Sequence, residues 1–169
     1  MNRLFIRFTS TTVLILSLTS CASFSSVVKK VSGTVQVNAL TGLPGSNGDI
    51  LAVKIDDTLP AHPQIGLSQA DVIYIEQVEG GLTRLATIFS TPEKMPSLLG
   101  PVRSARISDI DILAQYGRVA FAFSGAQRKL FPVINSANLE NLGAEREPSS
   151  IYSRDKTREA PTNLILHPQ

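Results

Sequence analysis

The segment that most constrains the fold is "ADVIYIEQVEGGLTRLATIFS", residues 70–90. Two runs rich in β-branched and aromatic residues flank Gly80 and Gly81. Paired glycines suit a two-residue hairpin turn, in which the central residues need positive φ. With these glycines at the tip, Glu79 is expected to face Leu82. The segment therefore predicts an antiparallel β-hairpin.

The alternation of side chains along these strands assigns the charged residues to faces. The expected register puts Gln77 opposite Arg84, which makes Arg84 a diagonal neighbour of Glu79, within reach of a long side chain. Glu76 is expected on the opposite face, among apolar neighbours. A carboxylate in such surroundings needs a partner or has a function.

The rest of the chain alternates further strands and helices. Ser108, with Asp111 three residues later, has the spacing of a helix-starting capping box, and Gly117 is a typical helix stop. Mixed elements around an antiparallel hairpin predict an α+β fold with a mixed β-sheet and flanking helices. The expected elements are strands at 50–56 and 119–123, helices at 106–117 and from 126 at least up to Pro132, and short extended pieces at 149–154 and 162–168.

The N-terminus has the organisation of a secretory signal over residues 1–20. Arg3 and Arg7 precede an apolar run that is too short to span a bilayer as a helix. Cys21, the single cysteine of the chain, follows Thr19 and Ser20. The string Leu18-Thr19-Ser20-Cys21 resembles the lipobox of bacterial lipoproteins, in which this cysteine becomes the first residue and carries fatty acyl chains such as palmitate.

The chain is thus expected to have three parts. Residues 1–20 form a lipoprotein signal peptide, 21–48 a lipidated N-terminus and tether with one short strand near residues 33–37, and 49–169 the α+β domain. An ordinary secretory signal is the alternative for the first part, and both place the domain outside the cytoplasm. A disulfide is excluded, because no second cysteine is present.

The charge balance argues against nucleic-acid binding. Lys and Arg total 16 and Asp and Glu total 14; without Arg3 and Arg7 the balance is 14 to 14. A nucleic-acid surface needs clustered basic residues, and this chain has no such run. No phosphate loop, dinucleotide fingerprint or metal-ligand spacing occurs, so neither a cofactor nor a metal is expected.

The string "GPVRSAR", residues 100–106, is a candidate ligand site. Arg103 and Arg106 are three residues apart and lie on one side of a helical turn if the helix begins this early. Two guanidinium groups could clamp a carboxylate or phosphate, with Ser104 between them. The alternative is internal pairing of the arginines with Glu76, Glu79, Asp109 or Asp155.

The sequence patterns that would indicate a hydrolase are weaker than the arginine string. Ser124 follows a strand, but the glycine of a nucleophile elbow is missing before it. The two histidines, His62 and His167, lie in a proline-rich turn and at the chain end. A pair of carboxylates, Glu76 with Asp109 or Asp111, stays open as an acid–base pair acting on glycan.

Several strings in this order closely resemble the signature of the YerB-like family, bacterial lipoproteins with a domain of unknown function. The match covers about residues 38–166, and the resemblance implies an extracytoplasmic envelope protein with a mixed α/β domain and no established activity. The strings are "NALTGLP", "AVKIDDTLPAHPQIGLSQADVIYIE", "VEGGLTRLATIF", "GPVRSARISDIDILAQYG", "FSG" and "RDKTREAPTNL".

The chain departs from this family pattern at a few positions. Ala39 stands where a proline is usual, Asp57 where an asparagine is usual, and Thr162 where a histidine is expected. Family members also continue into a further C-terminal region, which this chain is expected to lack. A site completed by that region is therefore in question.

These observations favour a membrane-anchored binding or scaffold protein of the cell envelope. Its expected partners are the membrane, through the lipid on Cys21, and an anionic wall polymer or a wall-associated protein. The alternative is a cell-wall hydrolase that uses a carboxylate pair on glycan or peptide. The candidate ligand-binding residues are Arg84, Arg103, Ser104, Arg106, Glu76, Glu79, Asp109 and Asp111.

Overall fold

The computed structural model describes residues 35–146 and 150–168. The expected signal peptide, Cys21 and the first half of the expected tether lie outside these residues. The compact unit that contains the sheet begins at Gln36. No helix of the described part is long and apolar enough to cross a membrane.

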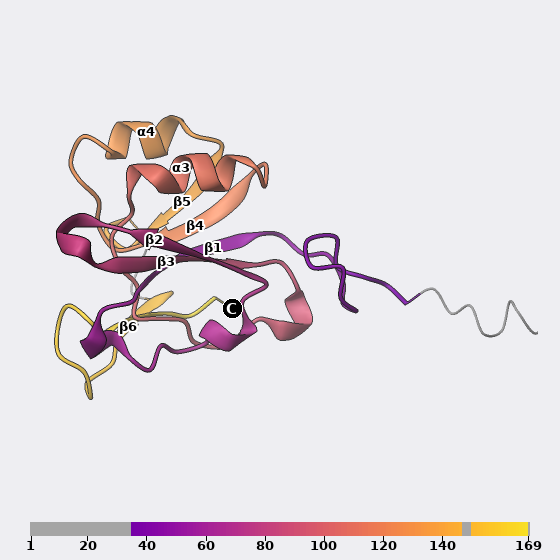
Figure 1. Cartoon of the computed structure of the whole chain (residues 1–169), viewed down its shortest axis with the longest axis horizontal. Helices are drawn as coiled ribbons and strands as arrows, with labels where there is room; N and C mark the ends of the chain where they lie inside the picture. The colour runs from indigo at the N-terminus through magenta and orange to yellow at the C-terminus, as the bar shows by residue number, and fades with distance from the viewer. Residues whose placement is uncertain (1–34, 147–149, 169) are drawn as a thin grey trace, which may run out of the picture. The chain divides into compact units, whose positions relative to one another are not determined.

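A mixed five-stranded sheet forms the centre of the domain (Figure 1). The central strand β1 pairs antiparallel with β3 and parallel with β4. Strands β1 and β4 are buried over nearly their whole length because both faces of the sheet are covered there. The expected α+β fold with an antiparallel hairpin is confirmed. The order across the sheet is β2 (Val72–Gln77), β3 (Thr83–Phe89), β1 (Leu51–Asp56), β4 (Val119–Phe123) and β5 (Leu139–Gly143).

Different elements cover the two faces of the sheet (Figure 1). The helices α3 (Ile107–Ala114) and α4 (Phe131–Ser136) pack on one face. The antiparallel pair β6 (Tyr152–Arg154) and β7 (Leu164–Leu166) packs on the other. In the described part of the chain, four short 3-10 helices lie in the connections: η1 (Leu59–Ala61), η2 (Leu67–Gln69), η3 (Glu79–Gly81) and η4 (Pro92–Lys94).

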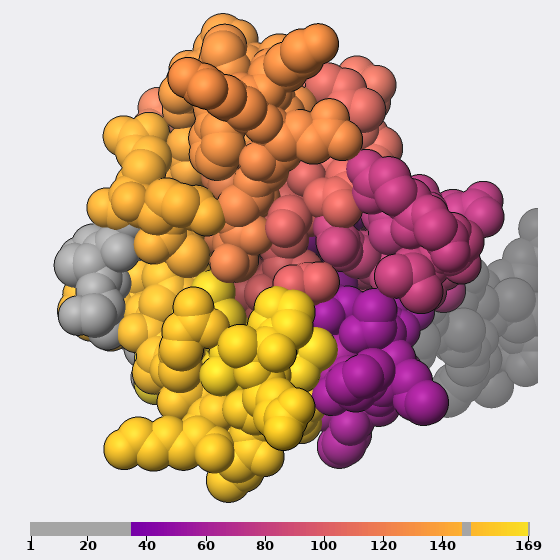
Figure 2. Space-filling view, turned by 90° about the vertical axis from the view of Figure 1, so that its left-hand side faces the viewer, coloured from indigo at the N-terminus to yellow at the C-terminus, as the bar shows by residue number. Residues whose placement is uncertain are grey.

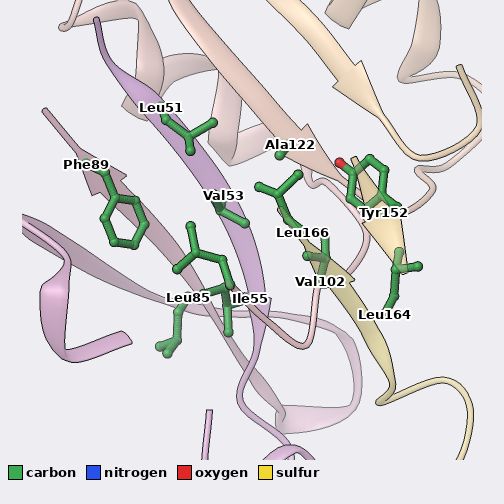
Figure 3. Close-up of a cluster of buried hydrophobic side chains, with 11 residues drawn as sticks. Leu51, Val53, Ile55, Leu85, Phe89, Val102, Ala122, Tyr152, Leu164 and Leu166 are labelled. Atoms are coloured by element: carbon green, nitrogen blue, oxygen red, sulfur yellow. The ribbon is translucent and has the colours of Figure 1, made fainter. Parts of the chain in front are cut away.

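Strand β1 supplies side chains to both cores. Leu51, Val53 and Ile55 point toward β6 and β7 and lie in the cluster shown in Figure 3. Ala52 belongs to the cluster on the helical face. Lys54, also fully buried, interrupts this apolar pattern. A buried ammonium requires charged partners, and these define the site described below.

The hairpin has a different turn from the one expected. Gly80 and Gly81 both have positive φ, 74° and 72°, but they belong to the three-residue turn η3 rather than to a two-residue turn. Val78 donates to the carbonyl of Leu82 at 2.8 Å. The register therefore shifts by one residue, and Arg84 lies opposite Glu76, not Gln77.

Both helix starts also differ from expectation. Helix α3 begins at Ile107, and Asp109 accepts a hydrogen bond from the Arg106 backbone N–H at 2.6 Å. The expected Ser108–Asp111 capping box is wrong, because Ser108 donates its hydroxyl to Glu76 instead. Helix α4 begins at Phe131 rather than at residue 126, and Pro132 lies in its first turn, where proline is tolerated because no helical N–H bond is needed.

The described part of the expected tether packs against the domain. Asn38 is buried, and its side-chain amide donates to the Ser46 carbonyl at 3.0 Å and to the Ser90 hydroxyl at 3.1 Å. The only strand-like contact near the expected short strand, among the described residues, is an isolated bridge between Val37 and Pro44. Ordered packing thus begins earlier than residue 49.

Candidate functional site

The candidate residues lie close together at one end of the sheet, where the last residues of β1 and β2 and the first residues of β3 are neighbours. Register places Arg84, at the start of β3, between Asp56 at the end of β1 and Glu76 near the end of β2. Ligands of sheets with parallel strands commonly bind beyond the carboxyl ends of those strands. The edge formed by β1 and β4 here is of that kind.

The segment 102–106 crosses this edge. Arg103 donates its backbone N–H to the Lys54 carbonyl at 2.8 Å and accepts from the Ser124 N–H at 2.9 Å. These bonds place the segment between the carboxyl ends of β1 and β4. In Figure 2 the salmon segment lies at the centre of this face, between the magenta hairpin tip, the orange segment before α4 and the yellow C-terminal segment.

Lys54, Glu76, Asp109 and Ser108 form a buried group that we call the lysine cluster. The Lys54 ammonium contacts a Glu76 carboxylate oxygen and lies 2.7 Å from Asp109 Oδ1. Ser108 donates its hydroxyl to the other Glu76 oxygen. Lys54 and Asp109 are fully buried and Glu76 nearly so, so each charge is satisfied within the protein.

The pKa values of the two carboxylates in the lysine cluster shift in opposite directions. Burial raises the pKa of Asp109 to about 6, assisted by the nearby charge of Glu76 and opposed by Lys54. Burial also acts to raise the pKa of Glu76, but hydrogen bonds from Lys54 and Ser108 outweigh it, and the pKa is lowered. The cluster therefore keeps Glu76 ionised in preference to Asp109.

Arg84, Arg103 and Arg106, with Asp56 and Glu79, form a second charged group that we call the arginine edge. Arg84 is buried and donates to the Ser104 carbonyl at 3.3 Å, while its Nε has no partner among the described residues. Burial lowers the pKa of Arg84, and the charges of Arg106 and Arg103 add to this effect. Three guanidinium groups share two carboxylates here.

The other two arginines of this edge have different partners. Arg103 Nε lies 2.9 Å from the buried Asp56 Oδ2, although the N–H is not aligned for a hydrogen bond. Arg106 contacts Glu79 Oε2 through two nitrogens, Nε and Nη2, each at 2.8 Å. Both arginines precede α3, so they do not share a helical turn as the sequence suggested.

A pocket of about 230 Å³ opens beside Arg106, between the start of α3 and the start of α4. Glu79 from the hairpin tip forms part of its wall and accepts a hydrogen bond from Gln127 at 3.3 Å. Charged and apolar side chains share the lining. The lining residues are Glu79, Ala105, Arg106, Ile107, Gln127, Lys129, Leu130 and Val133.

The structure brings together most of the residues expected from the sequence, with two exceptions and two additions. Asp111 is exposed on α3, and no hydrogen bond or ion pair of its side chain occurs among the described residues. Ser104 contributes its carbonyl oxygen, which both Arg84 and Arg106 approach. Sequence reasoning missed Lys54 and Asp56. The signal was present, because a lysine inside the apolar run "LAVKID" is rarely buried without a partner.

The histidines do not complete a serine–histidine–aspartate triad among the described residues. His62 Nε2 lies 3.2 Å from Asp57 Oδ1, and His167 shares a 2.7 Å hydrogen bond with Ser153. Ser124 lines a separate pocket of about 580 Å³ with Ser153 and without either histidine. Within residues 35–146 and 150–168, no group of three or more His, Cys, Asp or Glu side chains could hold a metal ion.

Comparison with known proteins identifies relatives over this domain. A curated relative, "Putative lipoprotein YerB" from Bacillus subtilis (strain 168), is 45% identical over 56 residues, which are 33% of this chain and 16% of the relative. The crystal structure of YerB protein from Bacillus subtilis matches with a TM-score of 0.71 and 27% identity, over 78% of this chain and 46% of that chain.

The chain therefore spans less than half the length of the relatives that it matches. The match to the solved structure covers most of the described residues, and the fold class agrees with it. A family model described as "Protein of unknown function (DUF3048) N-terminal domain" matches residues 40–169, which include both charged groups described above. The chain belongs to this DUF3048 family, as its resemblance to YerB-like proteins predicted.

Proposed function

We propose that this protein is a lipid-anchored, extracytoplasmic binding module of the bacterial cell envelope. Cys21 carries the anchor, and the arginine edge recognises an anionic group on a wall polymer or a wall-associated protein. The lipobox-like string before Cys21 supports the anchor, as does the name of the Bacillus subtilis relative. Stable anchoring requires more than one acyl chain, which diacylation of a cysteine supplies.

One observation carries the binding role: the three guanidinium groups of the arginine edge share two carboxylates, and one of them, that of Arg106, borders a pocket. An anionic ligand that accepts from Arg106 would balance three guanidinium groups against three negative charges. Bidentate acceptance from arginine suits carboxylates and phosphates.

The contacts of the carboxylates favour binding over the hydrolase alternative. A glycosidase needs two carboxyl groups that flank a sugar in an open cleft. Glu76 and Asp109 instead converge on Lys54, and Asp109 is fully buried. A raised pKa such as that of Asp109 suits a general acid, but no substrate can reach a carboxyl group with no exposed surface.

The binding role is tested by retention of the purified domain on isolated cell-wall sacculi. Arg106→Ala should reduce retention at least about fivefold, and Arg106→Lys should restore it only partly, since a point charge cannot form the guanidinium fork. Arg118→Ala is the matched control, because Arg118 is exposed and, among the described residues, its one ion pair is a 4.0 Å contact with Glu140. An equal loss of retention in both alanine variants would mean that net charge alone causes the effect, and it would contradict a specific site.

The anchor is tested by metabolic labelling with a fatty acid. Cys21→Ser should abolish incorporation of the label and release the protein from the membrane fraction, because a serine hydroxyl does not form the thioether. A Ser20→Ala variant keeps a small residue before the thiol and should be labelled like the parent. Labelling of the Cys21→Ser variant at the parent level would contradict the anchor.

A further inference from the structure

The arginine that lines this pocket, Arg106, is already paired with a side chain of the protein itself. Glu79 places one carboxylate oxygen 2.8 Å from both Nε and Nη2 of Arg106. Its second oxygen accepts from Gln127 at 3.3 Å. Glu79 is nevertheless 60% exposed. A carboxylate in water loses little when it leaves such a contact, because exposed ion pairs contribute weakly to stability.

The position of Glu79 in the hairpin allows this side chain to leave. It lies in the turn η3, and Gly80 and Gly81 follow it with positive φ. A Cβ atom built on either glycine would meet no atom within 4 Å. The tip is therefore free of tertiary packing at these two positions, and a rotation of the Glu79 side chain requires no rearrangement of the core.

The pocket also has a cation that no carboxylate of the described residues balances. Lys129 lines it and is exposed, and no ion pair of Lys129 occurs within that part of the chain. With Glu79 in place, Arg106 is neutralised and the ammonium of Lys129 is not. If Glu79 leaves, two cations remain. The electrostatics thus favour a bound anion in either state.

Apolar side chains stand next to these cations. Ile107 is 63% exposed and Val133 is 38% exposed, and both line the pocket with the buried Leu130. Exposed apolar groups that surround a few converging polar groups are typical of ligand sites. The volume of about 230 Å³ is small, so the pocket fits one end of a ligand rather than a whole polymer.

We propose that this pocket binds the C-terminal end of a peptide, and that Glu79 occupies the carboxylate position in the unliganded protein. The terminal carboxylate replaces that of Glu79 on Arg106, with Lys129 nearby, and an apolar terminal side chain contacts Ile107 and Val133. This inference rests on the proposed function and specifies its ligand. One guanidinium, one ammonium and apolar walls suit a singly charged carboxylate better than a phosphate, which requires more donors.

The experiment uses calorimetric titration of the full domain with three probes. These are acetyl-glycyl-leucine with a free carboxylate, the same dipeptide as its C-terminal amide, and inorganic phosphate. The free acid should bind at least about tenfold more tightly than the amide and more tightly than phosphate. Preference for phosphate, or equal binding of acid and amide, would overturn the proposal.

Variants then test the role of Glu79. Glu79→Gln should tighten binding of the free acid about two- to fivefold, because the internal competitor for Arg106 is weakened. Glu93→Gln is the matched control: it removes an exposed carboxylate that bonds Ser46 and does not line the pocket. An unchanged or weaker affinity of Glu79→Gln, or an equal gain in Glu93→Gln, would overturn the displacement. Arg106→Ala should abolish binding of the acid.

The two proposals can fail separately. Loss of sacculus retention in Arg106→Ala, with no binding of the free dipeptide by the parent, would leave the binding module intact and remove the peptide ligand. Dipeptide binding without retention on sacculi would support the pocket as a site for peptide carboxylates and would contradict the cell wall as the source of the ligand. Circular dichroism melts of each variant show whether a lost signal reflects unfolding.

Discussion

The lysine cluster and the arginine edge lie at the same end of one sheet, and both combine basic side chains with carboxylates. They differ in how the charges are paired. In the lysine cluster one ammonium serves two buried carboxylates, and a serine hydroxyl completes the set. In the arginine edge, donors remain without partners among the described residues and one carboxylate, that of Glu79, is exposed.

This difference in pairing assigns different roles to the two groups: the lysine cluster stabilises the fold, and the arginine edge is suited to ligand recognition. A buried charge that loses its partner is expensive, so removal of one member of the lysine cluster should destabilise the domain strongly. Partly paired charges at a surface cost little to rearrange, so they can exchange an internal partner for an external one. The comparison predicts opposite responses to substitution in the two groups.

The largest effect is expected at the centre of the lysine cluster. Lys54→Met should lower the free energy of unfolding by about 3–5 kcal/mol, because Glu76 and Asp109 lose their shared counter-ion inside the protein. Urea denaturation measures this change. A triple variant that also carries Glu76→Gln and Asp109→Asn should recover part of the loss. Lys94→Met, at an exposed lysine in η4, should change stability by less than about 0.5 kcal/mol.

A stability effect of intermediate size should distinguish Arg103 from Arg106 within the arginine edge. Arg103→Ala should cost about 2–3 kcal/mol, since it removes the cation beside the fully buried Asp56. Arg106→Ala should shift the melting temperature by less than about 2 °C, because its partner Glu79 is exposed. Similar losses in both variants would contradict the division of the edge into a structural and a ligand-facing arginine.

The smallest expected effect is the contribution of Asp109 to the pH dependence of stability. Its pKa is about 6 in the folded protein, against an ordinary value of 3.8 for an aspartate in the unfolded chain, so the folded state holds a proton that the unfolded state releases. The resulting stability is present below about pH 4 and is lost as the pH rises through 6. The destabilisation caused by Asp109→Asn should therefore be about 2 kcal/mol larger at pH 4 than at pH 7. Urea denaturation of parent and variant at the two pH values measures the difference, and an ordinary salt bridge would give the opposite sign.

Strands β1 to β4, β6 and β7 lie in segments that were predicted to be extended because their signals are local, whereas β5 was not predicted. The apolar runs of β1 and β4 and the glycines of the hairpin each appear within a few neighbouring residues. The register was not predictable, because Gly80 and Gly81 fit a turn of either two or three residues, and the difference moves Arg84 from opposite Gln77 to opposite Glu76. One residue in a turn thus decides which side chains share a face.

The candidate site was predictable only in its residue types. The sequence indicated that Glu76 needs a partner but not that the partner is Lys54, which lies 22 residues away, or that Asp109, 55 residues from Lys54, joins the same cluster. Such pairs depend on the order of strands in the sheet. Local periodicity carries no information about that order.

The buried Asn38 determines where a mechanical force applied to the N-terminal segment would be transmitted to the domain. Asn38 bonds Ser90, just beyond the end of β3, whereas Arg84 lies near the start of the same strand, about 20 Å away at the rise of an extended chain. Figure 1 shows residues 36–48 at the right of the domain and the hairpin tip at the left. If Cys21 carries the proposed anchor, tension would enter the domain at Asn38, at the end opposite the arginine edge, and would turn that edge away from the membrane.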